Sequence, residues 1–159
     1  MTKKLNKKGT SLVELIAVIV IMGIIAGIAV PTTIAVINRQ KKNAAARSAE
    51  SAVSALKNVI LEAQADKAFA GAATLTGSVT YSSAYAITTF TIQKDNATAT
   101  DVSAKYDINV DNLKAVGTFT VKLTINGGTF EYTPTTAGAG FTVDGYQIAI
   151  DAEGSCTAS

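Results

Sequence analysis

The sequence predicts an α+β protein in which a long N-terminal helix packs against a small antiparallel β-sheet. Two observations support this class. From about residue 12 to residue 67, apolar residues first fill most positions and then recur at three- and four-residue steps, as they do in helices. From residue 68 onward the apolar spacing falls to two, which is typical of half-buried antiparallel strands. Because one helical block precedes a run of strands, the two kinds of element do not alternate, and this order favours α+β architecture.

Residues 10–37 form an apolar segment that is long enough to cross a membrane. Between Leu12 and Ile37 the only charged residue is Glu14. As a helix rising 1.5 Å per residue, the segment spans about 40 Å, whereas a hydrocarbon core is roughly 30 Å thick. We therefore expect a transmembrane helix. The lysines that precede it are expected to stay on the cytoplasmic side; they are Lys3, Lys4, Lys7 and Lys8.

Residues 38–67 continue the helix with an amphipathic pattern. No Gly or Pro interrupts residues 32–70, so we expect one helix from about Ser11 to Lys67. Its second half should pack on the head through one apolar face, formed by Ala49, Val53, Leu56, Ile60 and Ala63. The expected organisation is a cleaved leader (1–9), a transmembrane and assembly helix (10–37), an amphipathic helix (38–67) and an antiparallel β head domain (68–159).

Two hairpins are predicted in the head. Residues 116–125 alternate apolar and polar side chains and should pair with residues 129–133 around the turn at 126–128. Residues 141–143 should pair with 146–150 around Asp144-Gly145. Residues 85–93 and 105–110 are expected to be strands or strand-like loops. Residues 70–77 are expected to be irregular.

Composition limits the chemistry of the chain. There is no His and one Cys, so a zinc site is hard to build and an internal disulfide is excluded. No nucleophile elbow, phosphate loop or metal cluster is present, so we expect neither an enzyme nor a cofactor. The acidic head offers no basic footprint for nucleic acid. Cys156 is expected to be a free, partly exposed thiol. Solvated loop charges, rather than a calcium loop, are expected at Asp95, Asp101, Asp107 and Asp111.

The clearest motif is the run Lys7-Lys8-Gly9-Thr10-Ser11-Leu12-Val13-Glu14-Leu15, which leads directly into the apolar segment. It resembles the class III leader of type IV pilins and of the pseudopilins of type II secretion and competence systems. The resemblance covers roughly residues 3–40, and the head shows no specific match. It implies a membrane peptidase that cuts between Gly9 and Thr10 and methylates the new amine of Thr10. The family usually has Phe at that position.

The same resemblance implies a role and a set of partners. Glu14 becomes the fifth residue of the mature chain, where the family keeps its glutamate, and Pro31 falls where many members have a helix-disturbing proline. The implied partners are further copies of the chain in a helical filament, the prepilin peptidase and methyltransferase, an assembly platform with its ATPase, and the membrane before assembly.

Glu14 has two physical interpretations. A carboxylate in hydrocarbon is costly unless it is paired, and the amine of Thr10 on a neighbouring subunit is a natural partner. Alternatively, Ser11 and Glu14 fit a capping box at the start of the helix. Both can hold, because capping in the free subunit does not exclude intermolecular pairing later.

Gly23, Gly27 and Pro31 are candidates for a helix distortion. Pro31 lacks an N–H and clashes with the carbonyl of Gly27, and the two glycines weaken the helix. We expect this stretch to kink, or to unwind on assembly. The alternative is that Gly23 and Gly27 form a close helix-packing face.

The expected function is therefore a structural subunit of a type IV pilus-like surface filament. The first alternative is a pseudopilin of a type II secretion or DNA-uptake apparatus. The second is a membrane-anchored or secreted binding domain with an ordinary signal peptide, cut after Ala29. The expected location is the cell membrane, with the N-terminus cytoplasmic, and then the surface filament. Adhesion, motility, secretion and DNA uptake stay open as purposes.

Overall fold

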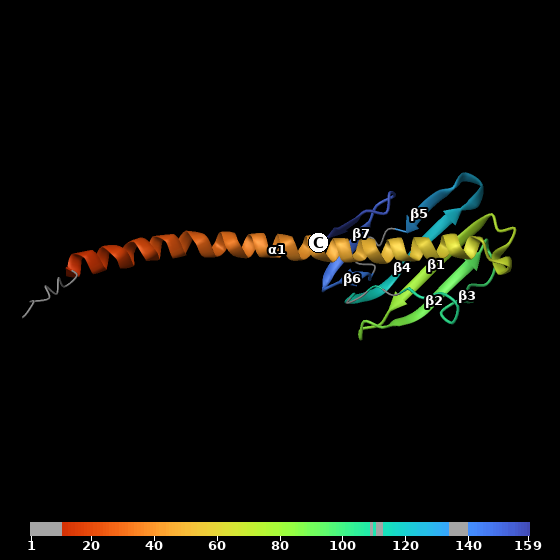
Figure 1. Ribbon diagram of the computed structural model, residues 1–159, viewed down its shortest axis with the longest axis horizontal. Helices are drawn as coiled ribbons and strands as arrows, with labels where there is room; N and C mark the ends of the chain where they lie inside the picture. Colours follow the sequence, from red (N-terminus) through yellow and green to blue (C-terminus); the bar gives the residue numbers. More distant parts are fainter. Residues whose placement is uncertain (1–10, 109, 111–112, 134–139) are drawn as a thin grey trace, which may run out of the picture. The chain divides into compact units, whose positions relative to one another are not determined.

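The computed structural model describes residues 11–108, 110, 113–133 and 140–159. The chain divides into two compact units, Met1–Gln40 and Lys41–Ser159, and each is considered by itself. The long helix α1 (Leu12–Gln64) begins in the first unit and ends in the second. In the second unit, the C-terminal part of α1 lies across one face of an antiparallel sheet (Figure 1). The predicted α+β class is therefore confirmed.

In the described part of the head, eight strands form the sheet, and every pair of neighbours is antiparallel. The order is β3-β2-β1-β4-β6-β7-β8, and β5 also pairs with β4. Two short 3₁₀ helices, η1 (Lys67–Phe69) and η2 (Ile125–Gly127), link elements. The strands are β1 (Thr74–Tyr81), β2 (Ile87–Lys94), β3 (Thr100–Asp101), β4 (Ala115–Thr124), β5 (Thr129–Thr133), β6 (Thr142–Val143), β7 (Tyr146–Ile150) and β8 (Cys156–Ala158).

Both predicted hairpins are present. β4 and β5 pair from Thr120↔Thr133 to Thr124↔Thr129, with η2 between them. In the turn between β6 and β7, Asp144 has a φ of 51° and Gly145 a φ of 82°. Two successive positive φ values characterise the tight hairpin turn whose twist matches that of the flanking strands. The strand expected at 85–93 also exists, as β2.

The expectation for residues 70–77 was wrong, and at residues 105–108 and 110 the structure has the loop alternative rather than the strand. Residues 70–77 are not irregular throughout, because β1 begins at Thr74 and pairs with both β2 and β4 at the centre of the sheet. Residues 105–108 and 110, by contrast, contain no strand. They belong to the connection from β3 to β4, in which Tyr106 and Ile108 are buried. Their apolar side chains therefore mark core contacts rather than strand pairing.

The core lies between α1 and one face of the sheet. All five residues of the expected helix face are buried, as predicted. The facing strand positions alternate with polar residues, so that β1 buries Leu75, Gly77, Val79 and Tyr81. At Gly77 the helix comes very close, since a Cβ there would lie 2.8 Å from Ile60 Cδ1 and 2.8 Å from Leu56 Cδ1. The absence of a side chain therefore lets α1 approach the sheet.

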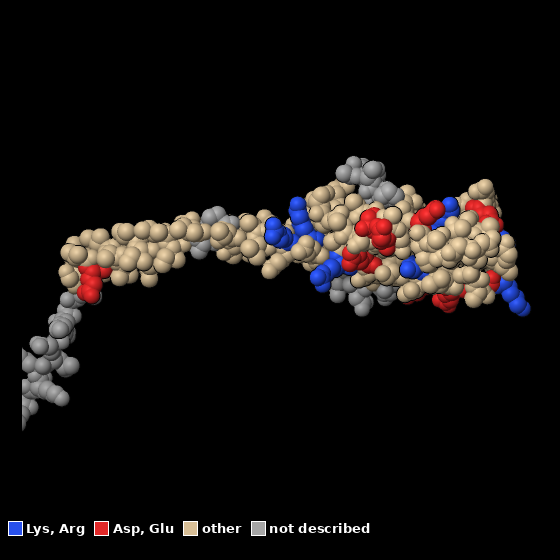
Figure 2. Space-filling view, turned by 90° about the horizontal axis from the view of Figure 1, so that it is seen from above, with Lys and Arg blue, Asp and Glu red and all other residues tan. Residues whose placement is uncertain are grey.

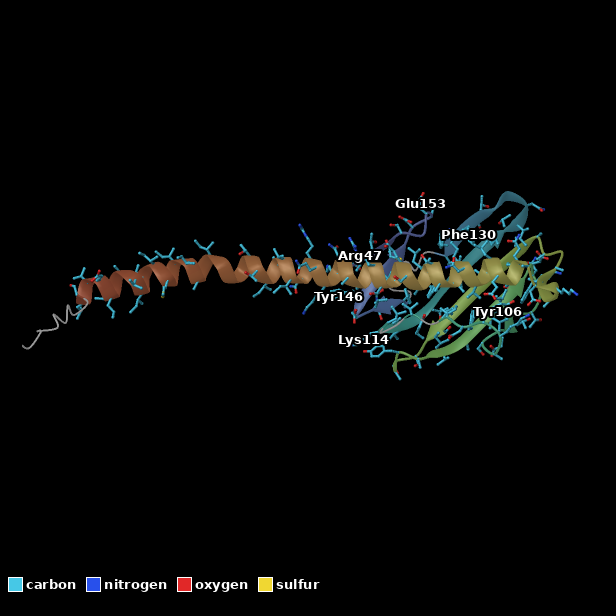
Figure 3. All side chains as sticks on the ribbon, in the orientation of Figure 1. Arg47, Tyr106, Lys114, Phe130, Tyr146 and Glu153 are labelled. Atoms are coloured by element: carbon cyan, nitrogen blue, oxygen red, sulfur yellow. The ribbon has the colours of Figure 1, made fainter. Side chains whose placement is uncertain are left out.

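The end of α1 differs slightly from the expectation. The helix stops at Gln64 rather than Lys67, and η1 follows. The side chain of Asp66 caps η1 by accepting a hydrogen bond from the N–H of Ala68 at 3.2 Å. The same carboxylate pairs with Lys105 and accepts a hydrogen bond from the Tyr106 hydroxyl at 2.7 Å. This contact fastens the β3–β4 connection, which includes Tyr106 (Figure 3), to the residues that follow α1.

Candidate functional site

The candidate site is the exposed apolar surface of α1 in the first unit. Among the side chains that the structure describes between Leu12 and Ile37, fifteen large apolar ones are exposed, including Ile19 at 60% and Ile28 at 66%. An 18-residue stretch reaches a mean hydropathy of 2.8, and none of it is buried by the chain's own fold. Among the described residues, α1 is the one helix that could cross a membrane by length and composition. Its exposure distinguishes it from the buried core helix of a soluble protein.

Glu14 is the single acidic residue of this surface and lies in the first turn of α1. It lines a hollow of about 480 Å³ together with Leu15, Val18 and Ile19. The carboxylate therefore has apolar neighbours, near a helix N-terminus whose dipole favours negative charge. The backbone N–H of Glu14 donates to the carbonyl oxygen of Ser11 at 2.9 Å rather than to its hydroxyl. Backbone hydrogen bonds thus close this turn without the side-chain bond of a capping box.

Gly9 and Thr10 lie outside the described residues. The cut between them, the methylation of Thr10 and the pairing of Glu14 with a neighbouring amine all stay predictions. Glu14 is thus the one residue of the predicted processing and pairing set that the structure places.

The candidate distortion residues lie within a helix that is continuous from Leu12 to Gln64. A Cβ at Gly23 or Gly27 would meet nothing within 4 Å. Neither glycine is therefore needed for packing inside the chain, and both offer a small surface that another helix could approach. The backbone at Pro31 is helical as well. The kink or unwinding expected on assembly concerns a filament and stays a prediction.

Asp95 was expected as a solvated loop charge, and its place in the structure is different. Its Oδ1 accepts hydrogen bonds from the N–H of Thr74 at 2.7 Å and of Ala73 at 2.8 Å. These bonds, that from Thr74 foremost, hold the pKa of Asp95 below its usual range. Asp101 similarly accepts from the N–H and hydroxyl of Ser103, which lowers its pKa. Within the described part of the chain, no group of acidic, Cys or His side chains could hold a metal.

Cys156 was expected to be partly exposed, and that expectation was wrong. The residue lies in β8, is only 6% exposed and packs into the core. Its N–H donates to Oε1 of Glu50 at 3.1 Å, and the same oxygen accepts from the hydroxyl of Ser155 at 3.3 Å. Burial and the nearby carboxylates of Glu50 and Asp151 raise the pKa of the thiol to about 12. Glu50, which no sequence pattern marked, thus ties the last strand to α1.

Comparisons of the chain with protein-family models, curated proteins and solved structures found no match. The class of protein therefore rests on the fold and the site together. It is an α+β protein whose head closes its own core, and whose N-terminal helix carries a membrane-length apolar surface that the chain itself leaves uncovered.

Proposed function

We propose that the chain is a structural subunit of a type IV pilus-like surface filament, assembled through the apolar part of α1. One observation carries the proposal: fifteen large apolar side chains are exposed among those described between Leu12 and Ile37. Removing one such side chain from water is favourable by about 1.5–3 kcal/mol, so we expect a surface of this extent to be buried against lipid or protein. Lipid covers it while the subunit is in the membrane, and the helices of neighbouring copies cover it in the filament.

Glu14 provides the directional element of this assembly. Apolar surfaces alone would let helices slide past one another, because the hydrophobic effect has no direction. A carboxylate one turn into the helix becomes favourable in an apolar filament core when a neighbour's Thr10 amine pairs with it. This pairing would neutralise both charges and would fix the vertical offset between subunits.

A pseudopilin would use the same kind of helix. The mode of assembly is therefore the same for a pilus-like filament subunit and for a pseudopilin. The length of the filament and its position outside the cell envelope separate them. A secreted binding domain differs in kind, because its mature chain would begin at Val30 and would keep only the last few residues of the candidate site, among them Ile34 and Ile37. Mass spectrometry of the mature N-terminus tests this directly: the proposal expects Thr10, and Val30 would exclude it.

The Glu14→Ala variant tests the assembly mechanism. We expect it to insert into the membrane and to be processed like the wild type, because the change makes the span more apolar. Surface filaments should fall at least about tenfold, since the unpaired amine of Thr10 would be buried at each subunit contact. Immunoblots of sheared filaments and of membranes measure the two quantities separately.

Glu62→Ala is the matched control, because Glu62 is an exposed glutamate on the same helix, in the second unit. It removes the same charge and should leave filament yield unchanged. A normal yield from Glu14→Ala, with Glu62→Ala also normal, would mean that Glu14 does not pair during assembly.

A further inference from the structure

Charge is strongly segregated along the chain after the apolar segment. Between Asn38 and Ala49 there are four basic residues and no acidic one; they are Arg39, Lys41, Lys42 and Arg47. From Glu50 to the C-terminus there are six basic and eleven acidic residues, which gives a balance of −5. Figure 2 shows blue side chains gathered where the second unit begins, and red ones together with some blue ones farther along it. The segregation places positive charge at the end of the head nearest the apolar segment in sequence.

Three of these residues belong to the second unit and form what we call the basic collar: Lys41, Lys42 and Arg47. All three are exposed. At about 100° per residue they lie roughly 100–140° apart around the helix, so they surround it rather than mark one face. Ala45, within the same stretch, is fully buried and marks where the head begins to cover α1.

The surroundings of the collar include one tyrosine and one acidic residue. Lys41 lines a hollow of about 370 Å³ together with Ala44, Asp144 and Tyr146. Tyr146 and Arg47 lie at the same end of the second unit (Figure 3). Tyrosine is enriched at the level of lipid head groups, where its ring and hydroxyl meet different environments. Asp144 is the acidic residue that lines this hollow.

Glu50 lies beyond the collar on α1, and its carboxylate is already engaged. Its Oε1 accepts hydrogen bonds from the Cys156 N–H and the Ser155 hydroxyl. Arg47 and Glu50 line two shared hollows, one with Asn43, Ala46 and Cys156 and one beside Val110. The collar therefore presents three exposed cations to the solvent, with Asp144 beside Lys41 and Glu50 beside Arg47 as the acidic neighbours.

We propose that the basic collar binds anionic phospholipid head groups on the outer face of the cell membrane while the subunit resides in that membrane. This rests on the proposed function, since it requires the apolar segment to span the bilayer. The collar begins four residues after Ile37, a rise of about 6 Å along a helix, which corresponds to head-group depth. Removal of the leader takes away the cytoplasmic lysines, so the collar and Arg39 then supply the cations that flank the span.

The acidic charge on the rest of the head also favours one orientation of the head relative to the membrane. An anionic surface attracts the collar and repels the region beyond Glu50, so the collar end faces the lipid. Each cation near such a surface raises the binding constant roughly fivefold, and screening by salt weakens this attraction. Extraction of the subunit into a filament would break these contacts. Anionic lipid would therefore slow premature release of the subunit from the membrane.

The test uses the full-length precursor in vesicles of phosphatidylcholine with 30% phosphatidylglycerol, probed with spin-labelled forms of each lipid. The wild type should associate preferentially with phosphatidylglycerol, and 0.5 M NaCl should reduce the preference. The variant Lys41→Gln/Lys42→Gln/Arg47→Gln should lower it at least about threefold. The leader lysines contribute equally to every protein compared.

Lys67→Gln/Lys94→Gln/Lys122→Gln is the control, because it removes the same charge from residues beyond the collar. Equal lipid preference in the two variants would overturn the proposal. So would a collar variant that loses filament yield while keeping its lipid preference, since the collar would then bind the acidic head of a second copy. If alkaline washing strips the precursor from the vesicles, the membrane span itself fails, and the proposed function fails with it.

Discussion

Burial governs the chemistry of Cys156, the single thiol of the chain. With its pKa raised to about 12, the thiol is almost entirely protonated at neutral pH. Because the thiolate is the reactive form, alkylation at pH 8 should be on the order of a thousandfold slower than for a free cysteine. Mass spectrometry after iodoacetamide treatment measures this rate, and the protein unfolded in guanidinium is the control. Comparable rates in the folded and unfolded protein would show that the thiol is accessible.

The roles of Cys156 and Asp95 illustrate what local sequence cannot reveal. Cys156 stands near the C-terminus, where exposure is a reasonable expectation, yet Glu50, 106 residues earlier, holds its N–H. Asp95 lies in a polar stretch, and its carboxylate caps backbone groups 21 and 22 residues away. By contrast, the burial of Val53, Leu56 and Ile60 follows from helical spacing alone and was predicted. Periodicity reveals a buried face, whereas a long-range hydrogen bond leaves no local pattern.

At the scale of elements, the contact between α1 and β1 depends on Gly77. Replacement by Val would place side-chain atoms against Ile60 and Leu56, and it should destabilise the head by about 1–3 kcal/mol. The thermal midpoint of the full chain in detergent, followed by circular dichroism, measures this. Ser78→Val is the control, because Ser78 is next in the same strand, on the opposite face, and should change stability by less than about 0.5 kcal/mol. Equal midpoints for the two variants would contradict close packing at Gly77.

The contact of Asp66 with Lys105 and Tyr106 predicts a dependence on pH. The hydrogen bond from Lys105, followed by those from Tyr106 and Ala68, lowers the pKa of Asp66 from 3.8 to about 2. Folding therefore favours the ionised carboxylate. This stabilisation is complete above the unfolded pKa near 3.8 and is lost as the pH falls toward 2.

Asp66→Asn should accordingly lower the thermal midpoint at pH 7, and the difference from the wild type should shrink between pH 4 and pH 2. Lys105→Gln, which removes the cationic partner, should show the same convergence. If the midpoint difference between wild type and Asp66→Asn were as large at pH 2 as at pH 7, the interaction would not depend on the charge of Asp66.

The sequence was a good guide to the elements with strong patterns and a poor one to β1. The long helix and both hairpins have unbroken periodicity or clear turn residues, and the structure confirms them. β1 also alternates, but its inward positions include Gly77, and its first residues follow a small-residue stretch that resembles a loop. The strand is held in place by β2 and β4 on its two sides, and that pairing is not visible in the local sequence.

At the scale of the whole molecule, two surfaces stand out as exposed in the part of the chain that the structure describes. The large apolar side chains of α1 are exposed from Leu12 to Ile28 and again from Ile34 to Ile37, and the basic collar adjoins this part in sequence. Cleavage after Gly9 would remove four lysines and leave ten basic and twelve acidic residues, changing the net charge from +2 to −2. The proposed mature subunit thus has an apolar assembly helix, positive charge beside it and an acidic head.

The most direct measurement is electron microscopy of sheared surface filaments from cells with and without the gene, combined with mass spectrometry of the purified filaments. We expect filaments that disappear on deletion, return on complementation, and contain this chain beginning at Thr10. Filaments that persist unchanged without the gene and do not contain the chain would contradict this expectation.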